Sequence, residues 1–129
     1  MQDKYTFEFA IIRVVPKVER EEFMNVGAIL FSKHKKFLSM RYRIDPKRLQ
    51  AFSCDVELEE LNAYLRSWQL ICAGGAEAGQ IGTMDQPSRF RWLTASRSTI
   101  IQSSKTHPGL CTDPQKELDD LFARYVLPD

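Results

Sequence analysis

The pattern of apolar side chains near the N-terminus predicts three β-strands. Residues 5–15 are apolar on both faces, as in a central strand, and Pro16 ends the run. Residues 23–31 are again largely apolar, and residues 37–44 alternate between apolar and polar side chains, which is typical of a half-exposed antiparallel strand. We therefore expect residues 23–44 to form a hairpin whose outer face is basic.

Two residues interrupt these apolar runs. Gly27, inside the second strand, indicates a β-bulge or the close approach of another backbone. Arg13 continues the row of Tyr5, Phe7, Phe9 and Ile11 on the first strand. Because an unpaired buried charge is costly, we expect Arg13 to be paired or to lie at the mouth of the sheet.

Helical spacing dominates the rest of the chain. Asp45-Pro46 is a typical start for a short helix, and Asp113-Pro114 repeats that start near the C-terminus. A longer helix is predicted to begin at Asp55 and to end at Gly74-Gly75, on the three- and four-residue spacing of Leu58, Leu61, Leu65, Trp68 and Cys72. The last helix is predicted to dock by a stripe made of Leu118, Leu121, Phe122, Tyr125 and Val126.

The segments between the two longer helices carry weaker patterns. Residues 76–87 indicate a connector loop, residues 87–93 a short helix or strand, residues 98–103 a strand, and residues 107–109 a turn. No βαβ alternation is present. The order predicts one α+β domain over residues 1–129, with a mainly antiparallel sheet and about three helices packed on one face.

Composition narrows the class of protein. With 129 residues, 43% hydrophobic and 27% charged, the chain has the composition of an ordinary globular domain and not of a disordered or fibrous protein. The sequence contains neither a run of ~18–20 apolar residues nor the pattern of a signal peptide, so we expect a cytoplasmic protein without membrane association. Three widely spaced cysteines, Cys54, Cys72 and Cys111, predict reduced thiols.

Charge is unevenly distributed along the chain. Residues 1–52 hold eleven Lys or Arg against six Asp or Glu, net +5, whereas residues 53–129 hold seven against eleven, net −4. This pattern indicates either a nucleic-acid surface or a hairpin that meets the protein's own acidic half, and the lack of exposed aromatic residues interleaved with the basic ones favours the second interpretation. The basic patch consists of Lys33, Lys35, Lys36, Arg41, Arg43, Lys47 and Arg48.

Candidate site residues are concentrated in two polar segments, residues 19–27 and 89–107. Arginine forks bind carboxylate or phosphate, and histidine transfers protons near neutral pH. One hypothesis is an anion site in which Arg13 and Arg97 bind phosphate, His107 acts as acid or base and Glu22 orients. The remaining candidate binding residues are Arg20, Glu21, Asn25, Arg89, Arg91 and Gln102.

Each of these candidates also has a structural interpretation. Glu21 or Glu22 could pair with Arg13 or Arg97 in an internal network that fixes the end of the sheet. Cys111 is four residues after His107. Cys111 could therefore be a nucleophile beside a histidine base, or it could be a packed thiol with no chemical role. No cofactor or metal is predicted, because the two histidines are far apart and the acidic residues show no ligand spacing.

Long strings of this sequence resemble the domain of unknown function 3037 family. The resemblance is carried by residues 15–30, 79–82, 89–102 and 107–114, with Gln80 and Ser96 departing from the expected pattern. Members of that family are small bacterial proteins, often encoded beside a protein with a HipA-like kinase domain. The resemblance implies a two-gene module of the toxin–antitoxin or regulatory kind, and it supplies no catalytic residues.

Two functions follow as hypotheses. The first is a non-enzymatic accessory protein that binds a protein partner, with a HipA-like kinase-fold protein as the implied partner. The alternative is a nucleic-acid-binding protein or ribonuclease that uses Arg97, His107 and Glu22, with the basic hairpin as its docking surface. The sequence leaves the oligomeric state open.

Overall fold

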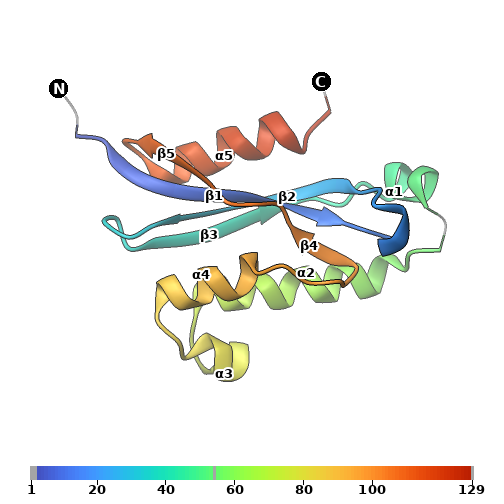
Figure 1. The fold of residues 1–129 in the computed structure, drawn as a ribbon, viewed down its shortest axis with the longest axis horizontal. Helices are drawn as coiled ribbons and strands as arrows, with labels where there is room; N and C mark the ends of the chain where they lie inside the picture. Colours follow the sequence, from blue (N-terminus) through green and yellow to red (C-terminus); the bar gives the residue numbers. More distant parts are fainter. Residues whose placement is uncertain (1–2, 54, 129) are drawn as a thin grey trace.

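A computed structural model describes residues 3–53 and 55–128 and confirms the α+β class (Figure 1). All strand pairings are antiparallel, and the sheet has the order β3-β2-β1-β4, with β5 also paired to β1. The strands are β1 (Tyr5–Val14), β2 (Met24–Ser32), β3 (Phe37–Tyr42), β4 (Ile101–Ser103) and β5 (His107–Cys111). The α-helices are α1 (Pro46–Phe52), α2 (Leu58–Ala73), α3 (Gly79–Gly82), α4 (Gln86–Thr94) and α5 (Pro114–Tyr125), with 3-10 turns η1 (Val18–Arg20) and η2 (Ala76–Ala78).

The central position predicted for β1 is confirmed. β1 pairs with β2 along one edge and with both β5 and β4 along the other. A β-bulge in β2 opposite Ile12 and Arg13 shifts the register, so that Gly27 pairs with Ile12 and Asn25 pairs with Arg13. A Cβ on Gly27 would lie 2.8 Å from the carbonyl oxygen of Arg41, so the close approach predicted at this glycine is also present.

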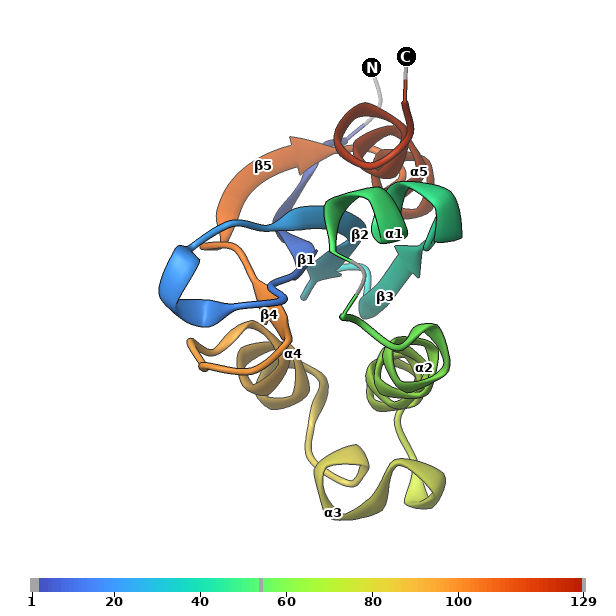
Figure 2. The same cartoon turned by 90° about the vertical axis from the view of Figure 1, so that its right-hand side faces the viewer.

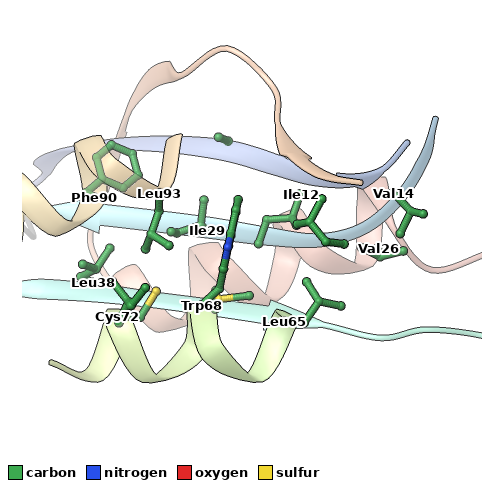
Figure 3. Close-up of a cluster of buried hydrophobic side chains, with 14 of the residues drawn as sticks. Ile12, Val14, Val26, Ile29, Leu38, Leu65, Trp68, Cys72, Phe90 and Leu93 are labelled. Carbon is green, nitrogen blue, oxygen red and sulfur yellow. The ribbon is translucent and has the colours of Figure 1, made fainter. Parts of the chain in front are cut away.

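Helices cover both faces of the sheet, which corrects the expectation of a single helical layer. α2 and α4 lie on one face and α5 on the other (Figures 1 and 2). The α2/α4 face holds the larger core, which includes Ile12, Val14, Ile29, Trp68 and Phe90 (Figure 3). The α5 face holds a second core, which includes Phe7, Ile11, Leu30, Leu118 and Phe122. Because β1 and β2 are apolar on both faces, each face needs its own cover.

Several local expectations are also corrected. Residues 107–109, predicted as a turn, begin β5, and the 76–87 connector contains η2 and α3. The long helix begins at Leu58 and not at Asp55, and the strand predicted over residues 98–103 is reduced to β4. No helix in the described part of the chain is long and apolar enough to cross a membrane.

Candidate functional site

Three candidate residues from distant parts of the sequence form one row across the sheet. Arg13 on β1 pairs with Asn25 on β2 and with Gln102 on β4. Directly paired residues on neighbouring strands project to the same face. The structure therefore brings Arg13, Asn25 and Gln102 together.

This row projects to the α5 face of the sheet. Ile12 and Val14, the neighbours of Arg13 on β1, are buried in the core of the α2/α4 face, so Arg13 projects to the opposite side. The side-chain amide of Asn25 donates a hydrogen bond to the carbonyl oxygen of Tyr125, at the end of α5, at 3.1 Å. The row therefore lies beside the C-terminal end of α5.

Arg13 has an aromatic partner but no acidic one. Its Cζ atom lies 3.9 Å from the centroid of the Phe23 ring, so the guanidinium group stacks on that ring. Among the described residues, no carboxylate forms an ion pair with Arg13. Two atoms of the row, Arg13 Nε and Asn25 Oδ1, are buried without a hydrogen-bond partner. An orphaned buried polar group calls for an explanation, and a functional site is one.

A cavity of about 470 Å³ borders this row. Phe23 is 46% exposed and Tyr125 is 41% exposed, so two aromatic rings form an open wall. Arg48 donates a hydrogen bond to the carbonyl oxygen of Val126, at 3.4 Å, and so fixes the end of α5. The cavity is lined by Phe23, Met24, Asn25, Arg48, Ala51, Phe52, Tyr125 and Val126. We call Arg13, Phe23, Asn25, Phe52 and Tyr125 the α5-end surface; Figure 2 views the molecule from this end.

Arg97 lies on the other side of the sheet. Its guanidinium carbon is 4.5 Å from the ring centroid of Trp92 and 5.3 Å from that of Trp68, and it donates a hydrogen bond to the carbonyl oxygen of Trp92. Both tryptophans belong to the core of the α2/α4 face or pack against it. The structure therefore does not bring Arg97 and Arg13 together into one anion site.

Two further candidate arginines connect structural elements on this same side. Arg91 makes a bidentate pair with Glu8 of β1, at 2.6 and 3.0 Å. Arg89 donates to the carbonyl oxygen of Met84 at 2.7 Å and lies against Gly74, where a Cβ would be 3.0 Å from its Cζ. These contacts hold α4 to the sheet and to the end of α2.

The acidic candidates have a local partner. Glu22 pairs with Arg20 at 2.5 Å on an exposed surface, and Glu21 ends η1 with a positive φ of 56°. In the described part of the chain neither carboxylate pairs with Arg13 or Arg97, so the predicted internal network is absent. Glu22 and Arg20 instead line a second cavity of about 320 Å³ beside Phe52.

His107 projects to the same face of the sheet as Arg13 but lies at a different level along β1. It pairs with Phe9 on β1, and the two ring centroids are 5.3 Å apart. Phe9 and Arg13 are four residues apart on one strand, which separates His107 from the row by about 13 Å along β1. Arg97, His107 and Glu22 thus lie in three separate places and do not form a joint catalytic set.

The cysteines that the structure describes are packed thiols. Burial raises the pKa of Cys72 to about 12. Burial, together with the nearby carboxylates of Glu117 and Asp113, raises the pKa of Cys111. Cys111 is also four strand residues from His107, about 13 Å, so the two do not form a nucleophile–base pair. Cys54 lies outside the described residues.

The basic patch is partly used inside the fold. Arg41 pairs with Asp119 of α5 at 3.0 Å and lies over the ring of Phe122, and Arg48 holds the end of α5. The hairpin thus meets the acidic C-terminal half, as the second interpretation of the charge pattern expects. Lys35 lies over the ring of Tyr5, and the side chains of the remaining members make no ion pair among the described residues: Lys33, Lys36, Arg43 and Lys47.

Three residues of the α5-end surface were not among the candidates: Phe23, Phe52 and Tyr125. Phe23 and Tyr125 follow apolar patterns that predict buried positions, but both are exposed beside Arg13 and Asn25. The sequence signal that could have identified Phe23 and Tyr125 is their place at the boundary of an apolar stretch, next to polar residues. In the described part of the chain no three His, Cys, Asp or Glu side chains come together as a metal site would require.

One comparison with known proteins gives a result. Residues 9–126 match a family described as "Protein of unknown function (DUF3037)". No curated protein and no solved structure matches the chain.

Proposed function

The chain belongs to the DUF3037 family of proteins of unknown function, and we propose that it acts by binding a protein partner through the α5-end surface. The observation that carries this proposal is that Phe23 and Tyr125 are exposed on one cavity, and that Arg13, which stacks on Phe23, has no acidic partner among the described residues. Aromatic residues and arginine are the types enriched at the centres of protein interfaces. A partner that covers this surface would bury both rings.

The first partner to test comes from the family resemblance. Family members are often encoded beside a HipA-like kinase-domain protein, so the proposal places this chain in a two-gene regulatory or toxin–antitoxin module with such a protein. The scattered positions of His107, Arg97 and Glu22 favour binding over catalysis, because catalysis needs these groups within reach of one reacting atom.

Co-expression with a HipA-like kinase-domain protein of the kind encoded beside family members, followed by gel filtration at micromolar concentration, tests the proposal. We expect one peak that contains both proteins. Phe23→Ala should weaken the complex about tenfold or more, the usual cost of truncating an interface anchor. Leu110→Ala is the matched control, because Leu110 is 61% exposed on β5 and projects away from the α5 face.

Two results would refute this function. The wild-type proteins could elute as separate peaks, which excludes a complex of useful affinity. Alternatively, Phe23→Ala could bind as tightly as Leu110→Ala, which excludes the α5-end surface as the docking site.

The alternative function, nucleic-acid binding, is favoured by Lys33, Lys36, Arg43 and Lys47, whose side chains remain without ion pairs among the described residues. Phosphate contacts make affinity fall steeply with salt. RNA binding that is tight at low salt and lost at high salt would support this alternative, and the absence of binding at low salt would remove it.

A further inference from the structure

We propose that Arg13 recognises a carboxylate of the partner, supplied by an Asp or Glu side chain or by a C-terminus. This inference rests on the proposed function and specifies the chemistry that the α5-end surface would accept.

The orientation of the fork leaves one edge for a ligand. Phe23 covers one plane of the guanidinium group at 3.9 Å, and Nε is buried. Among the described residues, no acceptor is bonded to Nη1 or Nη2. An arginine stacked on a ring keeps its N–H edge free and pre-oriented, and two parallel N–H groups match the two oxygens of a carboxylate.

The charges around Arg13 favour a single negative charge. Arg13 has no acidic partner in the described part of the chain, and the cavity that Phe23 lines holds one further cation, Arg48, which already donates to the Val126 carbonyl. The C-terminal end of α5 also lies here, because Asn25 bonds to the carbonyl oxygen of Tyr125. Helix C-termini carry partial negative charge, which penalises a doubly charged phosphate more than a carboxylate.

The wall of the cavity indicates that the carboxylate belongs to a protein segment. Phe23, Phe52 and Tyr125, together with Met24, line one cavity, and Phe23 is also the ring on which Arg13 stacks. A free small anion would leave this apolar wall exposed to water. A peptide with an acidic residue beside an aromatic or aliphatic residue would satisfy the fork and cover the rings in the same contact.

NMR titration of the ¹⁵N-labelled full-length protein tests the inference. The probe is N-acetyl-Phe-Glu-amide, and the neutral control is N-acetyl-Phe-Gln-amide. We expect the Glu peptide to shift the Arg13 Nε–Hε signal and the backbone signals of Phe23 and Tyr125 in a saturable way. The Gln peptide should bind on the order of tenfold more weakly, because it loses the charge-assisted hydrogen bonds.

Two variants separate recognition by the fork from general electrostatics. Arg13→Gln should abolish the preference for the Glu peptide, and Arg13→Lys should lose most of it, because lysine keeps the charge but not the fork. Arg124→Gln is the matched control: it removes one positive charge from α5 beside Tyr125. The preference for the Glu peptide should persist in Arg124→Gln.

The inference is overturned if the two peptides bind equally, if Arg13→Gln keeps the preference, or if inorganic phosphate binds more tightly than the Glu peptide. Its failure can be separated from failure of the proposed function. A partner complex that needs Phe23 but is unchanged by Arg13→Gln retains the function and refutes the carboxylate. Glu-peptide binding at Arg13 without any partner complex retains the carboxylate site and refutes the HipA-like partner.

Discussion

The two faces of the sheet use arginine in opposite ways. On the α2/α4 face, Arg97 lies against Trp68 and Trp92, and Arg91 pairs with Glu8. On the α5 face, Arg13 stacks on one exposed ring and has no acidic partner among the described residues. The same residue type thus stabilises the fold on one face and is left available on the other.

The helices that pack on each face of the sheet explain this difference. Two helices enclose the first face, and its core includes fully buried side chains of α2, α4 and three strands (Figure 3). The second face has one helix, α5, which packs against β2 and β3; beside it, Phe9 and Arg13 of β1 are only half-buried and His107 of β5 is exposed. The less covered face is therefore the one with room for a partner.

The largest expected effect comes from truncating a core side chain on the α2/α4 face, which two helices cover and which we call the closed face. Trp68 is only 2% exposed, and Trp68→Ala should lower the free energy of unfolding by about 3–5 kcal/mol, because the substitution removes a large buried side chain and leaves a cavity. Urea unfolding measures this change. Leu70→Ala, on the same helix but 38% exposed, is the control and should change stability much less. Equal losses for both variants would contradict a closed core on this face.

Alkaline pH should also destabilise the closed face, through Cys72. Burial raises the pKa of this thiol from 9.0 to about 12 in the folded protein. Above about pH 9 the unfolded chain loses the thiol proton while the folded protein keeps it, so stability falls as pH rises. The expected loss between about pH 9 and pH 11 is about 2 kcal/mol.

The measurement for Cys72 is urea unfolding of the wild type and of Cys72→Ala over this pH range. The difference in stability between the two proteins should shrink as pH rises, because only the wild type carries the thiol. Parallel pH profiles would show that Cys72 is not the source of the slope.

Arg97 should contribute a moderate part of the stability of the closed face. Arg97→Met keeps much of the apolar stem but loses the contact with two indole rings and the hydrogen bond to the Trp92 carbonyl. We expect a loss of about 1–2 kcal/mol in the free energy of unfolding. If the free energy of unfolding of Arg97→Met equals that of the wild type, Arg97 does not stabilise this face, and it is again a candidate for ligand binding.

Local signals allowed much of the fold to be predicted from the sequence. Asp45 and Asp113 each precede a proline, and in the structure each side chain accepts backbone hydrogen bonds at the start of α1 or α5. The apolar pattern on both faces of residues 5–15 likewise predicts the central strand. These signals depend on neighbours in the sequence, which is why they could be read directly.

The distribution of the helices and the identity of β5 could not be read in this way. Both depend on long-range packing: α5 crosses to the face opposite α2, and β5 is held by pairing with β1. Prediction of the site was limited in the same way: local patterns identified candidate residues, but not which of them come together. Arg13 was a candidate because it interrupts an apolar row, whereas the separation of Arg97 from it depends on which helices each face receives.

The most direct test of this comparison is the unfolding free energy of Arg13→Met beside that of Arg97→Met. Arg13→Met loses the stack on Phe23 but removes an N–H that is buried without a partner, so the two changes offset one another. We expect the free energy of unfolding of Arg13→Met to lie within about 0.5 kcal/mol of the wild-type value, and that of Arg97→Met to be clearly lower. A loss for Arg13→Met equal to or greater than that for Arg97→Met would contradict this expectation, because Arg13 would then also stabilise the fold.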